Sequence, residues 1–359
     1  MQLVPELNEG GVERGTVELN RELVKRGIDS VVVSAGGTLA ERIEKEGGRH
    51  IRLDIASKNP VSMPWRIAAL RRIVRRENPD IIHARSRVPA WLAWFADKPL
   101  KIPFVTTVHG FNSVSAYSKI MTYGDRVICV SNAVRDYVIK HYGTPLDKIV
   151  VIPRGIDTNL FCPDCVDTDF IEEFKARYAL DTKVIVSVVG RITQLKDLET
   201  FIAAIERLKK RVPNICGVIV GGVHKDKQAY YATLLDLVKK RKLQDHIVFV
   251  GSQSRVAEIY ALSDVVVSSS KKPESFGRSV AEAIAMNTPV VATRHGGVLD
   301  IVQEGLHGYF YTPQHTEELA EAIVRARTLR FDGYGYICKH FSLEKMVERT
   351  MRVYAEVST

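Results

Sequence analysis

The chain has 359 residues, which is long enough for two domains with separate hydrophobic cores. With 45% hydrophobic and 26% charged residues, it has the composition of an ordinary globular protein. No apolar stretch approaches the roughly 20 residues that a membrane-spanning helix needs. The start, MQLVPELNEGG, has no basic region followed by a long apolar run, so we expect no signal peptide and a cytoplasmic protein.

The formal charge of +9 comes largely from three basic stretches with helical patterns, at residues 65–76, 207–211 and 239–242. The first, WRIAALRRIVRR, suits either peripheral contact with the anionic inner face of the cytoplasmic membrane or a domain helix with a solvated basic face, and the pattern favours the second. We expect no nucleic-acid partner, because the chain has no recognised nucleic-acid motif. Five cysteines argue against a disulfide framework, and we interpret Cys162-Pro-Asp-Cys165 as a chance pair.

Short apolar runs alternate with helical patterns through the first half of the chain. Strands are expected at 2–7, 30–35, 51–55, 80–84, 103–109, 125–131 and 148–153, and helices at 12–26, 39–46, 65–77, 89–96, 115–123 and 132–141. This alternation predicts a parallel sheet that is covered by helices on both faces. Ligands of such sheets bind at the carboxyl ends of the strands.

Two features of the first half fall at strand ends. Gly10 and Gly11 separate the first strand from its helix, so the backbone there can approach an anionic ligand. The turn is not G-x-G-x-x-G and no acidic residue ends the next strand, which argues against a nicotinamide dinucleotide fold. His109 ends the strand in VTTVHG, where a lone histidine is more often a structural hydrogen-bonding group than a functional one.

The chain becomes acidic and loses its periodicity at residues 162–182, where we expect the domain boundary. We expect domains at 1–165 and 166–340, followed by a C-terminal helix within 341–359. In the second domain the expected strands are 183–189, 215–220, 246–250, 264–269, 289–293 and 308–311. The expected helices are 198–211, 228–242, 254–262, 278–286, 317–329 and 343–357.

Gly190 ends a buried strand in the second half and opens the run GRITQLKD. Arg191 and Lys196 flank the short loop that follows. Arginine offers a fork of donors to phosphate and lysine a compact charge, so the pair suits a diphosphate group. Two solvated cations are the ordinary alternative for such a pattern.

The stretch SSSKKPESFGRSVAEAIAMNTPVVATRHGG, residues 268–297, predicts a strand, a turn at Glu274-Ser275-Phe276-Gly277, a helix and another strand. The amides of Phe276, Gly277 and Arg278 would converge at the helix start, where the helix dipole also favours an anion. Glu274 and Glu282 would lie roughly 12 Å apart along a helix axis, which suits two acidic groups that bracket a diphosphate. No Asp-x-Asp triplet is present, and we expect no metal.

The spacing from Glu274 to Glu282 within PESFGRSVAEA, followed by PVVAT, resembles the signature of the retaining glycosyltransferases of family 4, which have the GT-B fold. The resemblance implies two Rossmann-like parallel-sheet domains that face a cleft and close on the donor, with a C-terminal helix that crosses back to the first domain. It implies a nucleotide diphosphate sugar as donor substrate and no cofactor. GGVERGTVELNREL resembles the family's loop over the donor phosphates, although the strand before it is shorter than usual, and we leave open whether it is complete.

The resemblance also implies roles for the candidate residues. Arg191, Lys196 and the Ser275–Arg278 turn would hold the diphosphate, Glu282 the ribose, Glu274 the transferred sugar, and His109 would help to orient that sugar. Gly190 would belong to the diphosphate loop, and Gly251 and Ser252, which follow HIVFV, match the segment that contacts the nucleotide base.

The function we expect is metal-independent, retaining transfer of a hexose-type sugar to a glycan or lipid-linked acceptor, in the synthesis of lipopolysaccharide core or another cell-surface polysaccharide. One alternative is a sugar-nucleotide epimerase or a phosphorylase on the same fold, although a phosphorylase would need a pyridoxal lysine and a longer chain. The other is a non-catalytic module that binds nucleotide sugars or membranes.

Overall fold

The computed structural model describes residues 1–8 and 10–358 and divides the chain into two compact units. Unit 1 comprises Met1–Gly155 together with Leu343–Thr359, and unit 2 comprises Ile156–Ser342. The division falls at Gly155, earlier in the chain than the boundary that the composition suggested.

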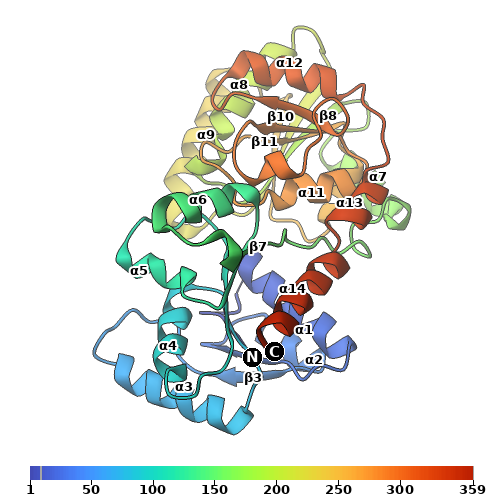
Figure 1. Ribbon diagram of the computed structural model, residues 1–359. Coiled ribbons are helices and arrows are strands. Elements are labelled where there is room, and N and C mark those ends of the chain that lie inside the picture. The colour runs from blue at the N-terminus through green and yellow to red at the C-terminus, as the bar shows by residue number, and fades with distance from the viewer. Residues whose placement is uncertain (9, 359) are drawn as a thin grey trace. The chain divides into compact units, whose positions relative to one another are not determined.

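Unit 1 is built on a seven-stranded parallel sheet with the strand order β3-β2-β1-β4-β5-β6-β7. Figure 1 labels β3 and β7 of this sheet and the helices around it. Its strands are β1 (Gln2–Leu3), β2 (Val31–Ser34), β3 (Arg49–Arg52), β4 (Ile82–Ala84), β5 (Phe104–Val108), β6 (Arg126–Cys129) and β7 (Ile149–Val151). The central strands β2 and β5 are fully buried and rich in β-branched residues, as expected for a parallel sheet covered on both faces, whereas the edge strands β3 and β7 are more exposed. β1 is much shorter than the expected strand at 2–7.

Helices cover both faces of this sheet, and each packs through one apolar side. They are α1 (Gly11–Lys25), α2 (Ala40–Lys45), α3 (Met63–Glu77), α4 (Arg87–Asp97), α5 (Ala116–Lys119), α6 (Asn132–Tyr142) and α14 (Leu343–Ser358). The C-terminal helix α14 packs on α1 through Leu343 and Val347, which contact Leu19 and Leu23. The helix expected at 115–123 divides into α5 and the 3-10 turn Ile120–Thr122.

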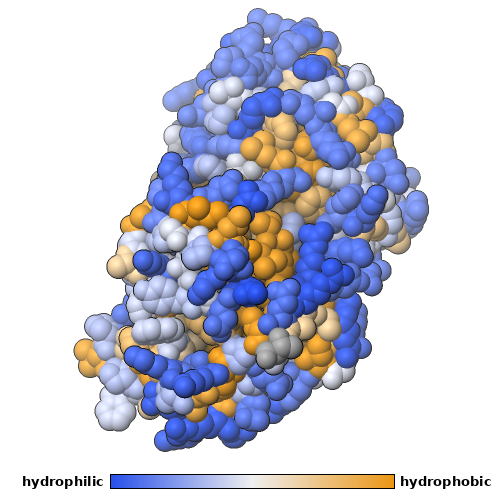
Figure 2. All heavy atoms as spheres, viewed as in Figure 1, coloured by the Kyte–Doolittle hydropathy of each residue, from blue (hydrophilic) through white to orange (hydrophobic). Residues whose placement is uncertain are grey.

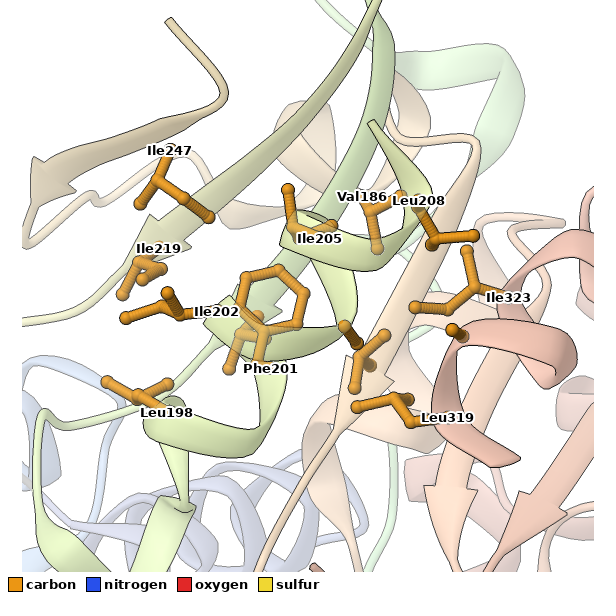
Figure 3. Close-up of a cluster of buried hydrophobic side chains, with 14 of the residues drawn as sticks. Val186, Leu198, Phe201, Ile202, Ile205, Leu208, Ile219, Ile247, Leu319 and Ile323 are labelled. Atoms are coloured by element: carbon orange, nitrogen blue, oxygen red, sulfur yellow. The ribbon is translucent and has the colours of Figure 1, made fainter. Parts of the chain in front are cut away.

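Unit 2 contains a six-stranded parallel sheet with the order β10-β9-β8-β11-β12-β13. Its strands are β8 (Val184–Val189), β9 (Ile215–Val220), β10 (Ile247–Gly251), β11 (Val265–Ser268), β12 (Val290–Thr293) and β13 (Gly308–Tyr311). Its helices are α7 (Thr168–Arg177), α8 (Leu198–Leu208), α9 (Gln228–Lys240), α10 (Val256–Ala261), α11 (Arg278–Ala285), α12 (Thr316–Ala326) and α13 (Gly333–His340). The core on one face gathers around Phe201 and Ile205 of α8 and Leu319 and Ile323 of α12 (Figure 3).

Two parallel-sheet, Rossmann-like domains were predicted, and this architecture is confirmed. The sequence analysis missed α7 and α13. Asp167 caps α7, and Asp332 caps α13, each through a side-chain oxygen that accepts a backbone N–H. It also missed a disulfide, because Cys162 and Cys165 are bonded to each other in the structure.

Each sheet contains one position where the strand order reverses direction along the chain. In unit 1 it lies between the neighbours β1 and β4, and in unit 2 between the neighbours β8 and β11. The connections on the two sides of such a point leave on opposite faces of the sheet, which opens a crevice at the carboxyl ends of the strands. Most candidate residues of each unit lie at or beside these two points, and Gly251 and Ser252 lie two strands away at the end of β10.

Candidate functional site

The loops that follow β8 and β11 are hydrogen-bonded to each other at the strand reversal of unit 2. The hydroxyl of Ser269 donates to the carbonyl oxygen of Lys196 at 2.5 Å, and the amide of Lys271 donates to the carbonyl oxygen of Leu195 at 2.8 Å. These bonds bring the run that contains Lys196 beside the stretch that leads into Glu274. Two segments that are distant in sequence therefore form one surface at the carboxyl edge of the sheet.

Lys196 and Glu274, two of the predicted site residues, form an ion pair in this surface. Nζ of Lys196 lies 2.6 Å from Oε1 of Glu274, and the hydroxyl of Ser270 donates to the same oxygen at 2.6 Å. Burial raises the pKa of Glu274, but the Lys196 charge, the hydrogen bonds from Lys196 and Ser270, and the charge of His295 together bring it below its usual value. Glu274 is therefore a carboxylate at neutral pH.

Gly190 makes room for the Lys196 side chain. It has a φ of +153°, and a Cβ at this position would lie 3.2 Å from Cε of Lys196, so the lysine stem passes close over the glycine. A side chain at residue 190 would displace the ammonium group from Glu274. The predicted glycine and lysine thus belong to one local arrangement.

The turn that precedes α11 is held by two glycines that the sequence analysis did not assign. Gly297 donates its amide to the carbonyl oxygen of Glu274 at 2.7 Å. Gly296 has a φ of +76°, and a Cβ there would lie 2.4 Å from the same carbonyl oxygen. The signal was the Gly-Gly pair two residues after the strand PVVAT, within the stretch already singled out.

Helix α11 begins at Arg278, immediately after this turn, and its first N–H groups have no acceptor within the helix. Gly277 allows the turn because it adopts φ +101°, in the left-handed region that favours glycine. The predicted strand, turn and helix start are therefore present at residues 265–285. Ser275 and Phe276 lie in the turn, and Phe276 is buried in the unit 2 core.

Glu282 is buried inside α11, not on a solvated helix face. Its Oε1 accepts from Nε of Arg278 at 2.9 Å, and its Oε2 accepts from the hydroxyl of Tyr260 at 3.0 Å. Tyr260 is a partner that the sequence analysis missed, since it lies in α10 and nothing in the local pattern of α11 points to it.

The remaining predicted residues of unit 2 lie along the same sheet edge. Arg191 is exposed and, in the part of the chain that the structure describes, no carboxylate lies within ion-pair distance of it. Gly251 ends β10, with Ser252 directly after it, and both are exposed. The strand order places them two strands from β8, so they are separated from the Lys196–Glu274 pair by the end of β9.

His109, Gly10 and Gly11 belong to unit 1. His109 follows β5 and lines a cavity of about 260 Å³, and neither ring nitrogen has a hydrogen-bond partner among residues 1–8 and 10–358. Burial, followed by the charges of Arg154, Arg85 and His83, lowers the pKa of His109 well below its usual value, so the ring is neutral at pH 7. A neutral imidazole can donate one hydrogen bond and accept another.

Gly10 and Gly11 lie at the start of α1. A Cβ on Gly11 would lie 2.6 Å from Nη1 of Arg154, and one on Gly10 would meet the carboxylate of Glu13. The two glycines therefore let the side chains of Glu13 and Arg154 lie close to the helix start. Among the described residues, no group of three or more His, Cys, Asp or Glu side chains is arranged to hold a metal ion.

Two family models match consecutive parts of the chain. "Glycosyltransferase Family 4" matches residues 9–160, and "Glycosyl transferases group 1" matches residues 170–330. A curated relative, N-acetyl-alpha-D-glucosaminyl L-malate synthase from Bacillus anthracis, is 24% identical over 95% of this chain and 92% of its own length.

The solved structures that resemble this one have the same fold. A glycosyltransferase from Rickettsia africae superposes with a TM-score of 0.91 at 29% identity, over 99% of this chain and 98% of its own. A protein from Anabaena, whose crystal structure contains UDP-glucose, superposes with a TM-score of 0.85 at 20% identity, over 99% of this chain and 98% of its own. The chain is therefore a glycosyltransferase in which a family 4 domain is followed by a group 1 domain.

Proposed function

We propose that this chain is a retaining, metal-independent glycosyltransferase that takes a hexose-type sugar from a nucleotide diphosphate sugar. The proposal depends on one observation above all. Lys196 and Glu274 meet at the strand reversal of unit 2, beside the helix start of α11. A cation, an anion and a helix N-terminus at one sheet edge provide groups for both the diphosphate and the hydroxyls of a bound donor.

In the proposed reaction the bond between the sugar and the diphosphate breaks, and negative charge grows on the departing diphosphate. Lys196, Arg191 and the amides of the Phe276–Arg278 turn would stabilise that charge, which is usually the largest contribution to catalysis. Glu282 would accept hydrogen bonds from the ribose hydroxyls. Gly251 and Ser252, further along the same edge, would contact the base.

Lys196 would exchange partners during donor binding. Its ammonium pairs with Glu274, and the phosphate oxygens of a donor would compete for the same charge. Glu274 would then be available to accept hydrogen bonds from the hydroxyls of the transferred sugar. His109, neutral and without a partner among the described residues, would contribute a hydrogen bond to that sugar and no charge.

The acceptor we propose is a glycan or a lipid-linked saccharide, in lipopolysaccharide core or another surface polysaccharide. The motifs NEGGVERG and PESFGRSVAEA support this by their resemblance to such enzymes. The neighbour crystallised with UDP-glucose supports a nucleotide-sugar donor. Neither that neighbour nor the relative named for L-malate supports a glycan acceptor in particular.

The basic stretch at 65–76 forms most of α3, and its apolar side is already used. Leu70 and Val74 are buried in the unit 1 core, and Ile67 and Ile73 pack against that core. The part of the molecule at α3 presents a largely hydrophilic surface (Figure 2). The described residues contain no helix that is long and apolar enough to cross a membrane.

The start of α3 offers a smaller surface for contact with a membrane. Val61 and Trp65, at the start of α3, are 79% and 78% exposed, and exposed arginines follow along the helix. We propose that this tip, defined as residues 61–65, touches an anionic membrane while the rest of α3 stays in the domain. Aromatic side chains favour the membrane–water interface, and the arginines would be attracted to anionic lipids.

Ligand binding and transfer test the proposed function together. The full chain is screened by thermal shift against UDP, GDP, ADP and their sugars, because a bound ligand raises the melting temperature by mass action. Transfer and donor hydrolysis are then measured for Lys196→Ala and Glu282→Ala, with Lys210→Ala, an exposed lysine of the same unit, as the matched control. We expect both site variants to lose activity by about 10²–10³-fold while remaining folded, and the control to retain it. Unchanged activity in both site variants would reject this site.

The same measurements separate the alternatives. A non-catalytic module would bind a nucleotide sugar without transfer or hydrolysis, and an epimerase would convert the sugar without releasing nucleotide. A phosphorylase would release sugar phosphate from a glycan. Activity that persists in the presence of EDTA is expected if Lys196 and Arg191 perform the role of a metal.

A further inference from the structure

The cavity in unit 1 lies at the strand reversal between β1 and β4. Pro5 follows β1, Arg85 and Ser86 follow β4, and Thr107 and His109 come from the end of β5, so the lining residues gather at the carboxyl ends of three neighbouring strands. Helix α1 contributes Glu13 from its first turn. At about 260 Å³ the cavity is slightly smaller than a typical drug-sized site, so it suits a compact ligand.

Arg85 is the unusual residue of this cavity. Only 6% of it is exposed, and its single hydrogen bond to the described residues runs from Nη1 to Oε1 of Gln2 at 3.0 Å. Nε is buried without an acceptor, and no carboxylate of residues 1–8 and 10–358 lies within ion-pair distance. Burial lowers the pKa of Arg85 to about 10, so the group remains charged at neutral pH. Glu18 and Glu13 act on this charge only from beyond ion-pair distance. A buried cation without a carboxylate in contact is costly, and such groups normally have an anionic partner.

The surroundings of Arg85 add positive charge and fixed polar groups. Arg87, the first residue of α4, lines the same cavity, and its Nη1 donates to the hydroxyl of Ser118 at 3.1 Å. Thr107 is held by a short chain of hydrogen bonds, from Tyr354 to Nδ1 of His83 at 2.6 Å and from Nε2 of His83 to Thr107 at 2.6 Å. The fixed hydroxyl of Thr107 and the ring of His109 are thus both positioned for a ligand.

We propose that this cavity is the anion-binding subsite of the acceptor, and that it takes a carboxylate or a phosphate carried by a small hydroxylated molecule or by the end of a glycan. Arg85 binds the anion with its free N–H groups, Arg87 adds a second charge, and Glu13 accepts a hydrogen bond from an acceptor hydroxyl. The identification of the bound molecule as the acceptor rests on the proposed function. The affinity of the subsite for anions does not depend on catalysis.

The donor diphosphate is the other anion to consider. Unit 2 has its own cations for it, Lys196 and Arg191, together with the start of α11. Substitutions of Arg85 and Lys196 can therefore be compared. The proposed subsite predicts that an Arg85 variant loses affinity for phosphate or succinate and keeps its affinity for UDP, and that a Lys196 variant shows the reverse.

The experiment uses the full chain and simple probes. Inorganic phosphate, succinate and UDP are titrated by calorimetry into the parent protein and into Arg85→Met, Arg85→Lys and Glu13→Gln. Arg75→Ala, an exposed arginine of α3 outside the cavity, is the matched control for general charge. UDP binding and circular dichroism report that each variant is folded.

We expect Arg85→Met to weaken phosphate binding by at least roughly tenfold, because charged hydrogen bonds are lost, while UDP binding is unchanged. The affinity of Arg85→Lys for phosphate should lie between those of the parent protein and Arg85→Met, since lysine keeps the charge but lacks the planar fork of donors. Glu13→Gln should bind phosphate more tightly, because a repelling carboxylate is removed. Stronger binding of phosphate than of succinate identifies a phosphorylated acceptor, and the reverse order identifies a carboxylate.

Three results overturn the subsite. Phosphate and succinate both fail to bind the parent protein, or Arg85→Met binds them as the parent does, or UDP abolishes phosphate binding and Arg85→Met weakens UDP equally. The last result would assign the cavity to the donor. A failure of the proposed function looks different, because Lys196→Ala would then leave UDP binding intact while the loss of phosphate in Arg85→Met remained.

Discussion

The two strand reversals of this protein have the same backbone topology and opposite side-chain electrostatics. In unit 2, Lys196 pairs with Glu274 and Arg278 with Glu282, while the exposed Arg191 has no carboxylate within ion-pair distance among the described residues. In unit 1, Arg85 has no carboxylate within ion-pair distance and neither ring nitrogen of His109 has a partner, as far as the described residues extend. The strand topology therefore determines where a ligand can bind. The pairing of the side chains determines whether a charged residue must leave its ion-pair partner before it can bind that ligand.

The largest effect is expected from a substitution at Gly296, which helps to hold the turn before α11 in unit 2. Gly296→Ala would place a Cβ 2.4 Å from the carbonyl oxygen of Glu274, in a backbone region almost confined to glycine. We expect a loss of roughly 1–3 kcal/mol in the free energy of unfolding, together with weaker nucleotide binding. Chemical denaturation and UDP titration measure the two effects.

Gly305→Ala is the matched control for that substitution. Gly305 also has a positive φ, +83°, but a Cβ there has no atom within 4 Å. Gly305→Ala should lower the free energy of unfolding only through backbone strain, on the order of 1–2 kcal/mol, and should leave nucleotide binding unchanged. Equal effects of the two substitutions on nucleotide binding would contradict the role given to the turn.

The pH dependence of stability should differ between the two reversals. The pKa of His109 is lowered in the folded protein, so the unfolded chain takes up a proton near pH 6.5 while the folded chain does not. Stability must then fall as the pH drops below about 6.5, by up to about 1.4 kcal/mol per pH unit. His83 is also buried with a lowered pKa, so His109→Asn should reduce this slope without removing it. The substitution His224→Asn, at an exposed histidine, should leave the slope unchanged in denaturation series from pH 8 to pH 5.

Glu274 acts in a lower pH window. Its pKa is lowered in the folded protein from a usual value of 4.5, so its stabilisation is fully present above that pH and is lost as the pH falls further. The slope of the free energy of unfolding between pH 8 and pH 5 should therefore depend on His109 and not on Glu274. A slope that changed in Lys196→Met but not in His109→Asn would contradict this difference between the two strand reversals.

The strength of the pair in unit 2 can be measured directly. A double-mutant cycle of Lys196→Met and Glu274→Gln should give a coupling of about 1 kcal/mol, because the pair is only partly exposed but remains in contact with solvent. The same cycle on Arg85 and Glu13 should give little coupling in the absence of anions. Comparable coupling in both would mean that the two reversals are not electrostatically different.

The smallest effect concerns the tip at residues 61–65. Trp65→Ala should weaken binding to vesicles of phosphatidylcholine and phosphatidylglycerol by about threefold, because one exposed aromatic ring is removed. Sedimentation with vesicles measures it, and vesicles of phosphatidylcholine alone test the contribution of the arginines. Binding that is absent in the parent protein would remove the membrane from the proposal.

The strands were the easiest elements to predict from sequence. Runs such as VVVS at 31–34 and VIVSVV at 184–189 are buried on both faces and bounded by polar or glycine turns, so local pattern is sufficient. The helix α13 was missed because GYGYICKH contains two glycines and has little amphipathic pattern. Its place depends on the capping Asp332 and on packing against α11.

Within the candidate sites, the loop residues were found by motif and the buried partners were not. Lys196 and Glu274 stand in recognisable runs, whereas Arg85 follows the strand DIIHA with nothing to mark it. Its burial depends on Gln2, which is distant in sequence, and on the first turns of α1. An arginine directly after a buried strand is the signal that could have found it, since Arg191 occupies the corresponding place after β8 and Gly190.

The amino-acid sequence by itself determined the alternation of strands and helices, the two successive sheets and the loops that carry Lys196 and Glu274, because these follow from local periodicity and turn residues. Only the tertiary structure decided which charges meet. The ion pair of Lys196 with Glu274, the burial of Glu282 against Tyr260 and the isolation of Arg85 depend on segments brought together by strand order. Electrostatic interactions act through space at a few ångströms, and spacing along the chain carries no record of them.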